Sequence, residues 1–152
     1  IIPVMKRFAE DFPQAGLAVS LHRLDDEGRS SIMPVNRKYP LDDLLEAARE
    51  YTGKTGRRIT FEYTLIKGEN DGGRDIELMK KKLSGSLCHI NLIPLNHVEE
   101  SGMTGSSCRR AEEIAGILNR SGIPATVRRE LGSEIDGACG QLRLKKPLPS
   151  LT

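Results

Sequence analysis

Apolar and polar residues follow two different spacings along the chain. Apolar positions that recur every three or four residues predict amphipathic helices, and apolar positions that alternate with polar ones predict strands. The loop 67–73 is rich in glycine but lacks the spacing of phosphate-binding loops, so we interpret it as a turn, and 25–28 is predicted as a polar loop. The predicted helices span 3–12, 40–52, the segment from the end of loop 67–73 to Leu83, and 111–118, and the predicted strands span 17–21, 59–65, 88–92 and 125–129.

The succession of strands and helices predicts parallel crossover units, and therefore an α/β fold. Strands that lie between two layers of helices are almost entirely apolar, whereas each predicted strand has one polar face, as at Thr60 and Glu62. This pattern favours a curved sheet, as in part of a barrel, whose concave polar side lines a ligand cavity with functional groups at the carboxyl ends of the strands. A half-exposed sheet with solvent on its polar face remains the alternative.

Composition sets limits on the class of protein. The chain has 152 residues, enough for one domain. It begins at Ile1 and not at Met, so we expect it to be part of a longer protein. The net charge of +2 gives no independent argument for nucleic-acid binding, and aromatic residues at 4% without tryptophan disfavour a base-stacking platform. No apolar run approaches about 20 residues, so we predict no membrane span.

The three cysteines differ in their surroundings. Cys88 begins an apolar strand and is predicted to be core, whereas Cys108 begins a helix and is predicted to be exposed. Cys139 lies in a loop between small residues, where a thiol is accessible, but its residues alone do not distinguish a nucleophile from an inert side chain. The spacings match no zinc or iron–sulfur pattern, so no metal site is predicted within the chain. Few cysteines favour a reducing compartment, and we predict a cytoplasmic protein.

Polar residues also mark two strand ends. Ser20 and His22 lie on the polar face at the end of the first strand, and Asn96 follows the third. Each is a weak signal alone, because such residues often serve only as structural hydrogen-bonding groups.

Five segments taken together resemble the C-terminal half of the RlmN/Cfr family of radical S-adenosylmethionine RNA methyltransferases, and they favour the RlmN branch. The resemblance covers nearly the whole chain in order. The segments are LAVSLH at 17–22, MPVNRKYPLDDLLEA at 33–47, RRITFEYTLIKGEND at 57–71, CHINLIPLN at 88–96 and EIDGACGQLR at 134–143.

The resemblance implies an enzyme that methylates carbon 2 of an adenine in large-subunit ribosomal RNA and in some transfer RNAs. It implies that Cys139 accepts a methyl group from S-adenosylmethionine, and that Ser20, Leu21, His22 and Asn96 contact this cofactor. Carbon 2 of adenine is electron-poor, so a radical route suits it better than direct polar transfer. The ligands of the 4Fe-4S cluster and the resolving cysteine belong to the N-terminal half in this family. We therefore expect the chain alone to be inactive.

Two expectations about organisation follow. The resemblance implies that residues 1–130 form half of a partial TIM-type (radical SAM) barrel, with three to four strands and flanking helices, and that 131–152 form the loop of Cys139 with a basic tail. The open strand edge at 17–21 predicts a homodimer. The rival hypothesis is a non-catalytic α/β module that binds a small ligand on its polar face, with Cys139 incidental.

Overall fold

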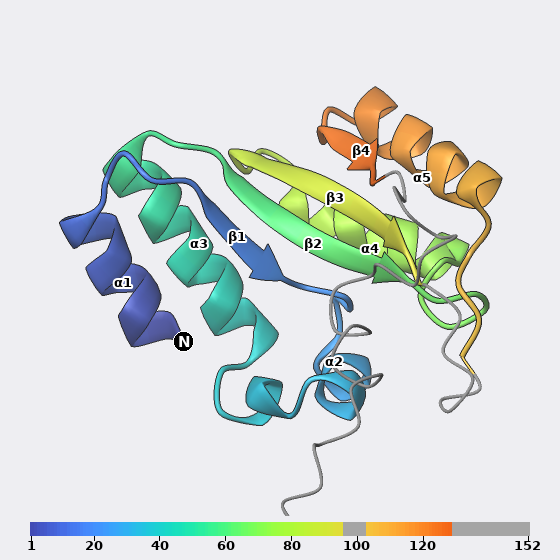
Figure 1. Ribbon diagram of the computed structural model, residues 1–152, viewed down its shortest axis with the longest axis horizontal. Coiled ribbons are helices and arrows are strands. Elements are labelled where there is room, and N and C mark those ends of the chain that lie inside the picture. Colours follow the sequence, from blue (N-terminus) through green and yellow to red (C-terminus); the bar gives the residue numbers. More distant parts are fainter. Residues whose placement is uncertain (96–102, 129–152) are drawn as a thin grey trace, which may run out of the picture.

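The computed structural model describes residues 1–95 and 103–128. A single parallel sheet and the helices that connect its strands make up this part of the chain (Figure 1). The elements in order are α1 (Ile2–Asp11), β1 (Leu17–Ser20), α2 (Asp26–Ile32), the 3-10 helix η1 (Pro34–Arg37), α3 (Leu41–Thr55), β2 (Ile59–Leu65), α4 (Gly73–Leu83), β3 (Cys88–Pro94), α5 (Cys108–Arg120) and β4 (Ala125–Val127).

The sheet has four strands in the order β1-β2-β3-β4, and all three pairings are parallel. Sequential order with parallel pairing is the arrangement expected for consecutive units of a βα barrel. The predicted α/β class is therefore confirmed. The carboxyl ends of the strands lie at one edge of the sheet (Figure 1), where Arg23 of the β1–α2 loop donates hydrogen bonds to Glu69 of the β2–α4 loop.

One face of the sheet forms the core with the helices. In β2 and β3 buried and half-buried residues alternate without exception, as the period of two predicts. The buried set packs against apolar stripes of α3, α4 and α5, and α1 covers α3. The sheet side of this core is formed by Ile59, Phe61, Tyr63, Leu65, Cys88, Ile90 and Leu92.

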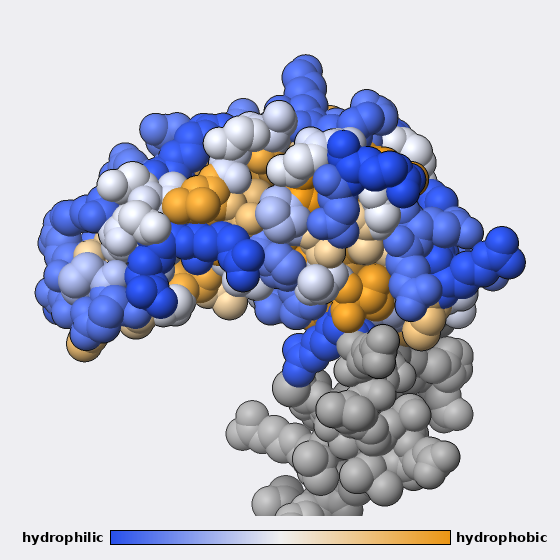
Figure 2. Space-filling view, turned by 90° about the horizontal axis from the view of Figure 1, so that it is seen from above, coloured by the Kyte–Doolittle hydropathy of each residue, from blue (hydrophilic) through white to orange (hydrophobic). Residues whose placement is uncertain are grey.

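The opposite face of the sheet is polar, as predicted. Thr60, Glu62 and Thr64 of β2 are half-buried on this face, next to His89 and Asn91 of β3. On the face of the molecule seen in Figure 2, hydrophilic residues predominate and hydrophobic ones appear in small groups. Among the residues that the structure describes, no helix is long and apolar enough to cross a bilayer.

The structure corrects several predicted boundaries. Residues 25–28, predicted as a loop, contain the start of α2: Asp25 is its N-cap and accepts a hydrogen bond from the N–H of Gly28 at 2.6 Å. Helix α3 passes the expected stop at Gly53 and ends at Gly56, which has a φ of 65° and can adopt this left-handed cap without strain. Strand β3 extends beyond Leu92 to Pro94, and β4 ends at Val127, before the predicted 129.

Two main-chain segments lie very close together beyond the carboxyl ends of β2 and β3. Gly105 forms an antiparallel bridge with Ile66, and Leu95 and Ser106 both donate their N–H groups to the carbonyl oxygen of Leu65. A Cβ atom at Gly105 would lie 1.9 Å from the carbonyl oxygen of Leu95. This position therefore requires glycine.

We predict opposite effects for alanine at two glycines. Gly105→Ala forces the main chains apart and lowers the free energy of unfolding by about 1–3 kcal/mol, the usual cost of overpacking. Gly53 lies within α3, where an added Cβ would meet no other atom within 4 Å, so Gly53→Ala raises the free energy of unfolding by up to about 1 kcal/mol through helix propensity. Urea unfolding measures both, and equal stability of the two variants would contradict the close approach at Gly105.

Candidate functional site

The segment Ser20–Leu21–His22 ends β1 with three side chains in three environments. Ser20 is exposed on the polar face and is in register with Glu62 of β2. Leu21 is fully buried in the core, so its side chain faces away from any ligand on the polar face. His22 is half-buried and has a φ of 57°, which is uncommon for a residue other than glycine. Ser20 and His22 are thus the side chains of this segment that a ligand could meet.

The ring of His22 forms a hydrogen bond that a longer β1 would otherwise form with β2. β1 ends at Ser20, while β2 continues to Leu65, so the main-chain groups at the end of β2 need partners other than β1. Nδ1 of His22 accepts a hydrogen bond of 3.0 Å from the N–H of Thr64. An acceptor nitrogen carries no proton, so the neutral ring must hold its proton on Nε2.

Asn70 fastens the same strand end from the β2–α4 loop. Its Nδ2 donates to the carbonyl oxygens of His22 at 2.8 Å and of Thr64 at 2.7 Å, and its Oδ1 accepts from the N–H of Ile66 at 2.7 Å. Asn70 is fully buried, and its own carbonyl oxygen accepts a hydrogen bond from the hydroxyl of Tyr63. This side chain therefore helps to hold the site in place, whereas the sequence pattern of 67–73 predicts only a turn there.

A buried arginine holds the segment from the other side. The guanidinium of Arg29, in α2, donates to the carbonyl oxygens of Leu21 and Ser20, each at 3.1 Å. It also donates to Oδ1 of Asn36, whose amide donates to Asp26. Arg29 is only 2% exposed, so these partners replace the water that its charge loses.

The electrostatics of the site follow from this burial. Burial lowers the pKa of His22, the positive charge of Arg29 lowers it further, and the nearby Glu62 carboxylate opposes both effects. The N–H of Leu41 and the amide of Asn36 lower the pKa of Asp26. His22 is therefore neutral near pH 7, and the Asp26 carboxylate is charged.

Further polar groups extend the site across the sheet. The amide of Asn91 donates to both carboxylate oxygens of Glu62, at 3.1 and 3.3 Å. Nε2 of His89 lies 2.8 Å from the hydroxyl of Thr126 on β4. Because Ser20 and Asn91 flank Glu62 in register, the polar side chains form one row that begins at the end of β1.

A second set of contacts ties the loops together. Arg23 donates to the main-chain carbonyl and the carboxylate of Glu69, so the β1–α2 loop is fixed to the β2–α4 loop. Asp71 in the latter accepts a hydrogen bond from Ser106 at 2.7 Å, and its carbonyl oxygen accepts two from Arg110 of α5. The loops at this edge therefore form one hydrogen-bonded layer.

Two predicted site residues, Asn96 and Cys139, lie outside the described residues, as does the predicted division at 130. Of the other cysteines, Cys88 is buried in the core and Cys108 is exposed, as predicted. Burial raises the pKa of the Cys88 thiol, which disfavours a reactive thiolate there. Within 1–95 and 103–128, no group of three His, Cys, Asp or Glu side chains could hold a metal ion.

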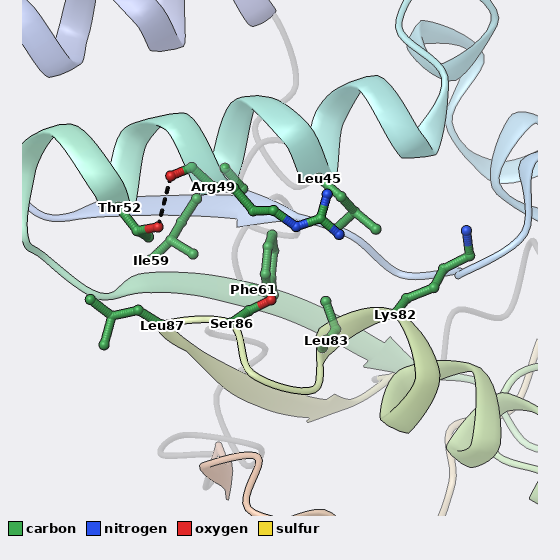
Figure 3. Close-up of a pocket in the computed structure, with 10 residues that line it drawn as sticks. Leu45, Arg49, Thr52, Ile59, Phe61, Lys82, Leu83, Ser86 and Leu87 are labelled. Atoms are coloured by element: carbon green, nitrogen blue, oxygen red, sulfur yellow. Dashed lines mark hydrogen bonds between the residues drawn. The ribbon is translucent and has the colours of Figure 1, made fainter.

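A groove on the helical side of the sheet is separate from this site. It lies between α3 and the α4–β3 connection, with Phe61 and Leu83 in its floor and the cationic ends of Arg49 and Lys82 at its margin (Figure 3). Phe61 and Glu62 are neighbours in β2 and therefore point to opposite faces of the sheet. The groove is thus on the other side of β2 from the polar row.

Several proteins similar in sequence to this chain are described as probable RNA methyltransferases. It is 48% identical over 145 residues to a probable dual-specificity RNA methyltransferase RlmN of Caldanaerobacter subterraneus subsp. tengcongensis, covering 95% of this chain and 42% of that protein. The protein of the same description from Alkaliphilus oremlandii is 47% identical with the same coverage, and that from Clostridium novyi is 48% identical, covering 94% and 42%. The chain thus spans about two fifths of the length of these relatives. No family model matches it.

Solved structures agree with these sequence matches. A radical SAM methyltransferase from Sphaerobacter thermophilus superposes with a TM-score of 0.88 at 47% identity, over 93% of this chain and 41% of that one. A domain of pyruvate-formate lyase-activating enzyme from Bacteroides vulgatus has a TM-score of 0.65 at 20% identity, over 82% and 74%, and shows the shared fold alone. This chain therefore matches the C-terminal part of the proteins named RlmN and of a radical SAM methyltransferase, in sequence and in fold.

Proposed function

We propose that this chain supplies one wall of an S-adenosylmethionine site and the methyl-accepting cysteine of an RNA methyltransferase. The observation that carries the proposal is the end of β1, where buried side chains bind the carbonyl oxygens of Ser20, Leu21 and His22 and so fix the turn at the edge of the polar face. Ligands of parallel α/β sheets bind at such carboxyl ends. The similarity to RNA methyltransferases supports methyl transfer as the reaction class, and the similarity to a radical SAM methyltransferase supports S-adenosylmethionine as the ligand.

The polar groups at the strand end fit a nucleoside cofactor. The hydroxyl of Ser20 can donate and accept, the Nε2–H of His22 can donate, and the carboxylate of Glu62 can accept hydrogen bonds from ribose hydroxyls. We propose that Ser20 and His22 contact the cofactor by their side chains and that Leu21 shapes the site from the core. Asn96 is proposed to contact the same cofactor from the end of β3.

S-adenosylmethionine would supply the methyl group and, with a 4Fe-4S cluster, the radical chemistry that an electron-poor carbon requires. We propose that the cluster is bound by the part of the protein that corresponds to the rest of the relatives' length. On this reading the chain alone binds no cluster and is inactive, and its own contribution is to bind and orient the cofactor.

We propose that Cys139 carries the methyl group to carbon 2 of adenine in large-subunit ribosomal RNA, and in transfer RNA as a second substrate. The relatives are described as dual-specificity RNA methyltransferases, which supports two RNA substrates. Cys88 is unsuited to this role, because it is buried in the core with a raised pKa.

We also propose that the protein is located in the cytoplasm, a reducing compartment in which free thiols such as those of Cys88 and Cys108 persist.

A chimaera tests the proposed reaction. In the RlmN of Caldanaerobacter, the homologous segment is replaced by this chain, and methylation of ribosomal RNA is followed by mass spectrometry of the adenosines. We expect 2-methyladenosine from the chimaera, none above background from its Cys139→Ala variant, and an unchanged amount from Cys108→Ala, which removes an exposed thiol. Methylation that survives Cys139→Ala would rule out the proposed role of this residue.

We further propose that the isolated chain forms a homodimer through the free edge of β1. Among the described residues β1 pairs only with β2, and an unpaired parallel edge favours association with a second copy.

Light scattering after size-exclusion chromatography measures this association. We expect a mass about twice the 16.8 kDa of the chain, which falls on dilution because the contact is small. A constant monomer mass at high protein concentration would contradict the homodimer and leave the proposed reaction untouched.

A further inference from the structure

We propose that Asn70 and Arg29 are positioning residues, which hold the turn at Ser20–His22 so that His22 presents a fixed N–H donor at Nε2 to a hydrogen-bond acceptor of the bound ligand. The inference deepens the proposed function and rests on it for the identity of the ligand. The geometry of the turn itself stands on contacts within this chain.

Every main-chain carbonyl oxygen of the turn is bound by a buried side chain. Arg29 binds those of Ser20 and Leu21, and Asn70 binds that of His22. These two residues come from two separate elements, α2 and the β2–α4 loop. The turn thus cannot rotate or shift without breaking hydrogen bonds in the protein interior, where broken bonds are costly.

This restraint explains the unusual backbone of His22. A φ of 57° is unfavourable for a side chain with a Cβ, and it persists where the surroundings impose it. Asn70 binds the carbonyl oxygens of both His22 and Thr64, and Thr64 donates its N–H to the ring of His22. The side chain of Asn70 and the ring of His22 therefore both link the turn to the end of β2 by hydrogen bonds.

The same contacts set the chemistry of the ring. Since Nδ1 is an acceptor for Thr64, the ring proton must be on Nε2. Burial is the largest influence on the pKa of the ring and lowers it; the charge of Arg29 in α2 lowers it further, and the carboxylate of Glu62 in β2 opposes both. A ring held in this state is a neutral donor.

The hydrogen bonding of the His22 ring favours one of the roles that a histidine can have in a binding site. With Nδ1 occupied and Nε2 protonated, the ring is poorly suited to bind a metal ion or to act as a base. It suits an acceptor on the ligand, such as a ribose oxygen, a carboxylate oxygen or a ring nitrogen of adenine. His22 would thereby fix the orientation of the cofactor.

The chain offers a matched control in Asn119. Its Nδ2 donates to the carbonyl oxygens of Ala115 and Ala125, and its Oδ1 accepts from the N–H of Ala125. These three hydrogen bonds repeat the pattern of Asn70 at the start of β4, away from the carboxyl ends of the strands, although Asn119 is more exposed. Loss of Asn119 therefore reports on the general effect of removing such a side chain.

Nitrogen NMR of the imidazole rings in the isolated 152-residue chain is the first test. We expect His22 to show an unprotonated Nδ1, a proton on Nε2 and a titration midpoint below the ordinary value of about 6.5. A proton on Nδ1, or a midpoint at or above the ordinary value, would overturn the inference without any variant.

Variants then test the positioning role. Asn70→Asp keeps the acceptor for Ile66 but removes both donated hydrogen bonds, and we expect it to free the turn, raise the His22 midpoint toward about 6.5 and mix the two ring tautomers. Asn70→Ala is expected to do the same. Because the new carboxylate of Asn70→Asp would itself raise the midpoint, agreement between the two variants identifies the loss of the donors as the cause. Asn119→Ala should leave the spectrum of His22 unchanged.

The methylating chimaera separates this inference from the proposed function. Asn70→Ala should raise the KM for S-adenosylmethionine about tenfold, the equivalent of one lost hydrogen bond, with a smaller effect on kcat, whereas Asn119→Ala should leave KM unchanged. An active chimaera whose KM is the same in both variants would refute the positioning role alone. A chimaera inactive without any substitution would count against the proposed function, while the NMR result decides the geometry of the turn.

Discussion

The unequal lengths of β1 and β2 are the constraint on which the site depends. β1 ends at Ser20, but its neighbour continues to Leu65 and carries main-chain groups that need partners in a partly buried setting. The ring of His22 and the amide of Asn70 satisfy these groups, and in doing so they bring the chain into a left-handed turn. The hydrogen bonds that satisfy the end of β2 thus also fix the turn Ser20–His22 at the edge of the sheet, and we call this rigid turn the polar corner.

The rest of the carboxyl edge reinforces this corner. A buried cation, Arg29, is stable there because main-chain carbonyls and Asn36 replace its water, and burial together with this charge lowers the pKa of His22. Arg23 and Asp71 connect the neighbouring loops, so the corner is part of a wider layer. The polar row through Glu62 and Asn91 then continues from the corner across the sheet. A site of this kind can hold an extended ligand with several acceptors and donors along its length.

The sequence predicted the fold better than the framework of the site. The alternation through Ile59, Phe61 and Tyr63 determined both the strand and its buried face, because burial alone sets that pattern. Helix α2 was missed because its first residues are charged and small, and its buried residue is an arginine, which apolar periodicity does not detect. The role of Asn70 depends on main-chain groups that are distant in sequence, and no local pattern reports those. Ser20 and His22 were found through a family resemblance, since their spacing alone is a weak signal.

The most direct test of the account is a crystal structure of the chimaera with S-adenosylhomocysteine bound. The account predicts the ligand on the polar face at the end of β1, with Nε2 of His22 and the hydroxyl of Ser20 each within about 3 Å of a ligand acceptor or donor. A ligand bound away from this corner, for example in the groove beside Phe61 on the helical side, would contradict the account.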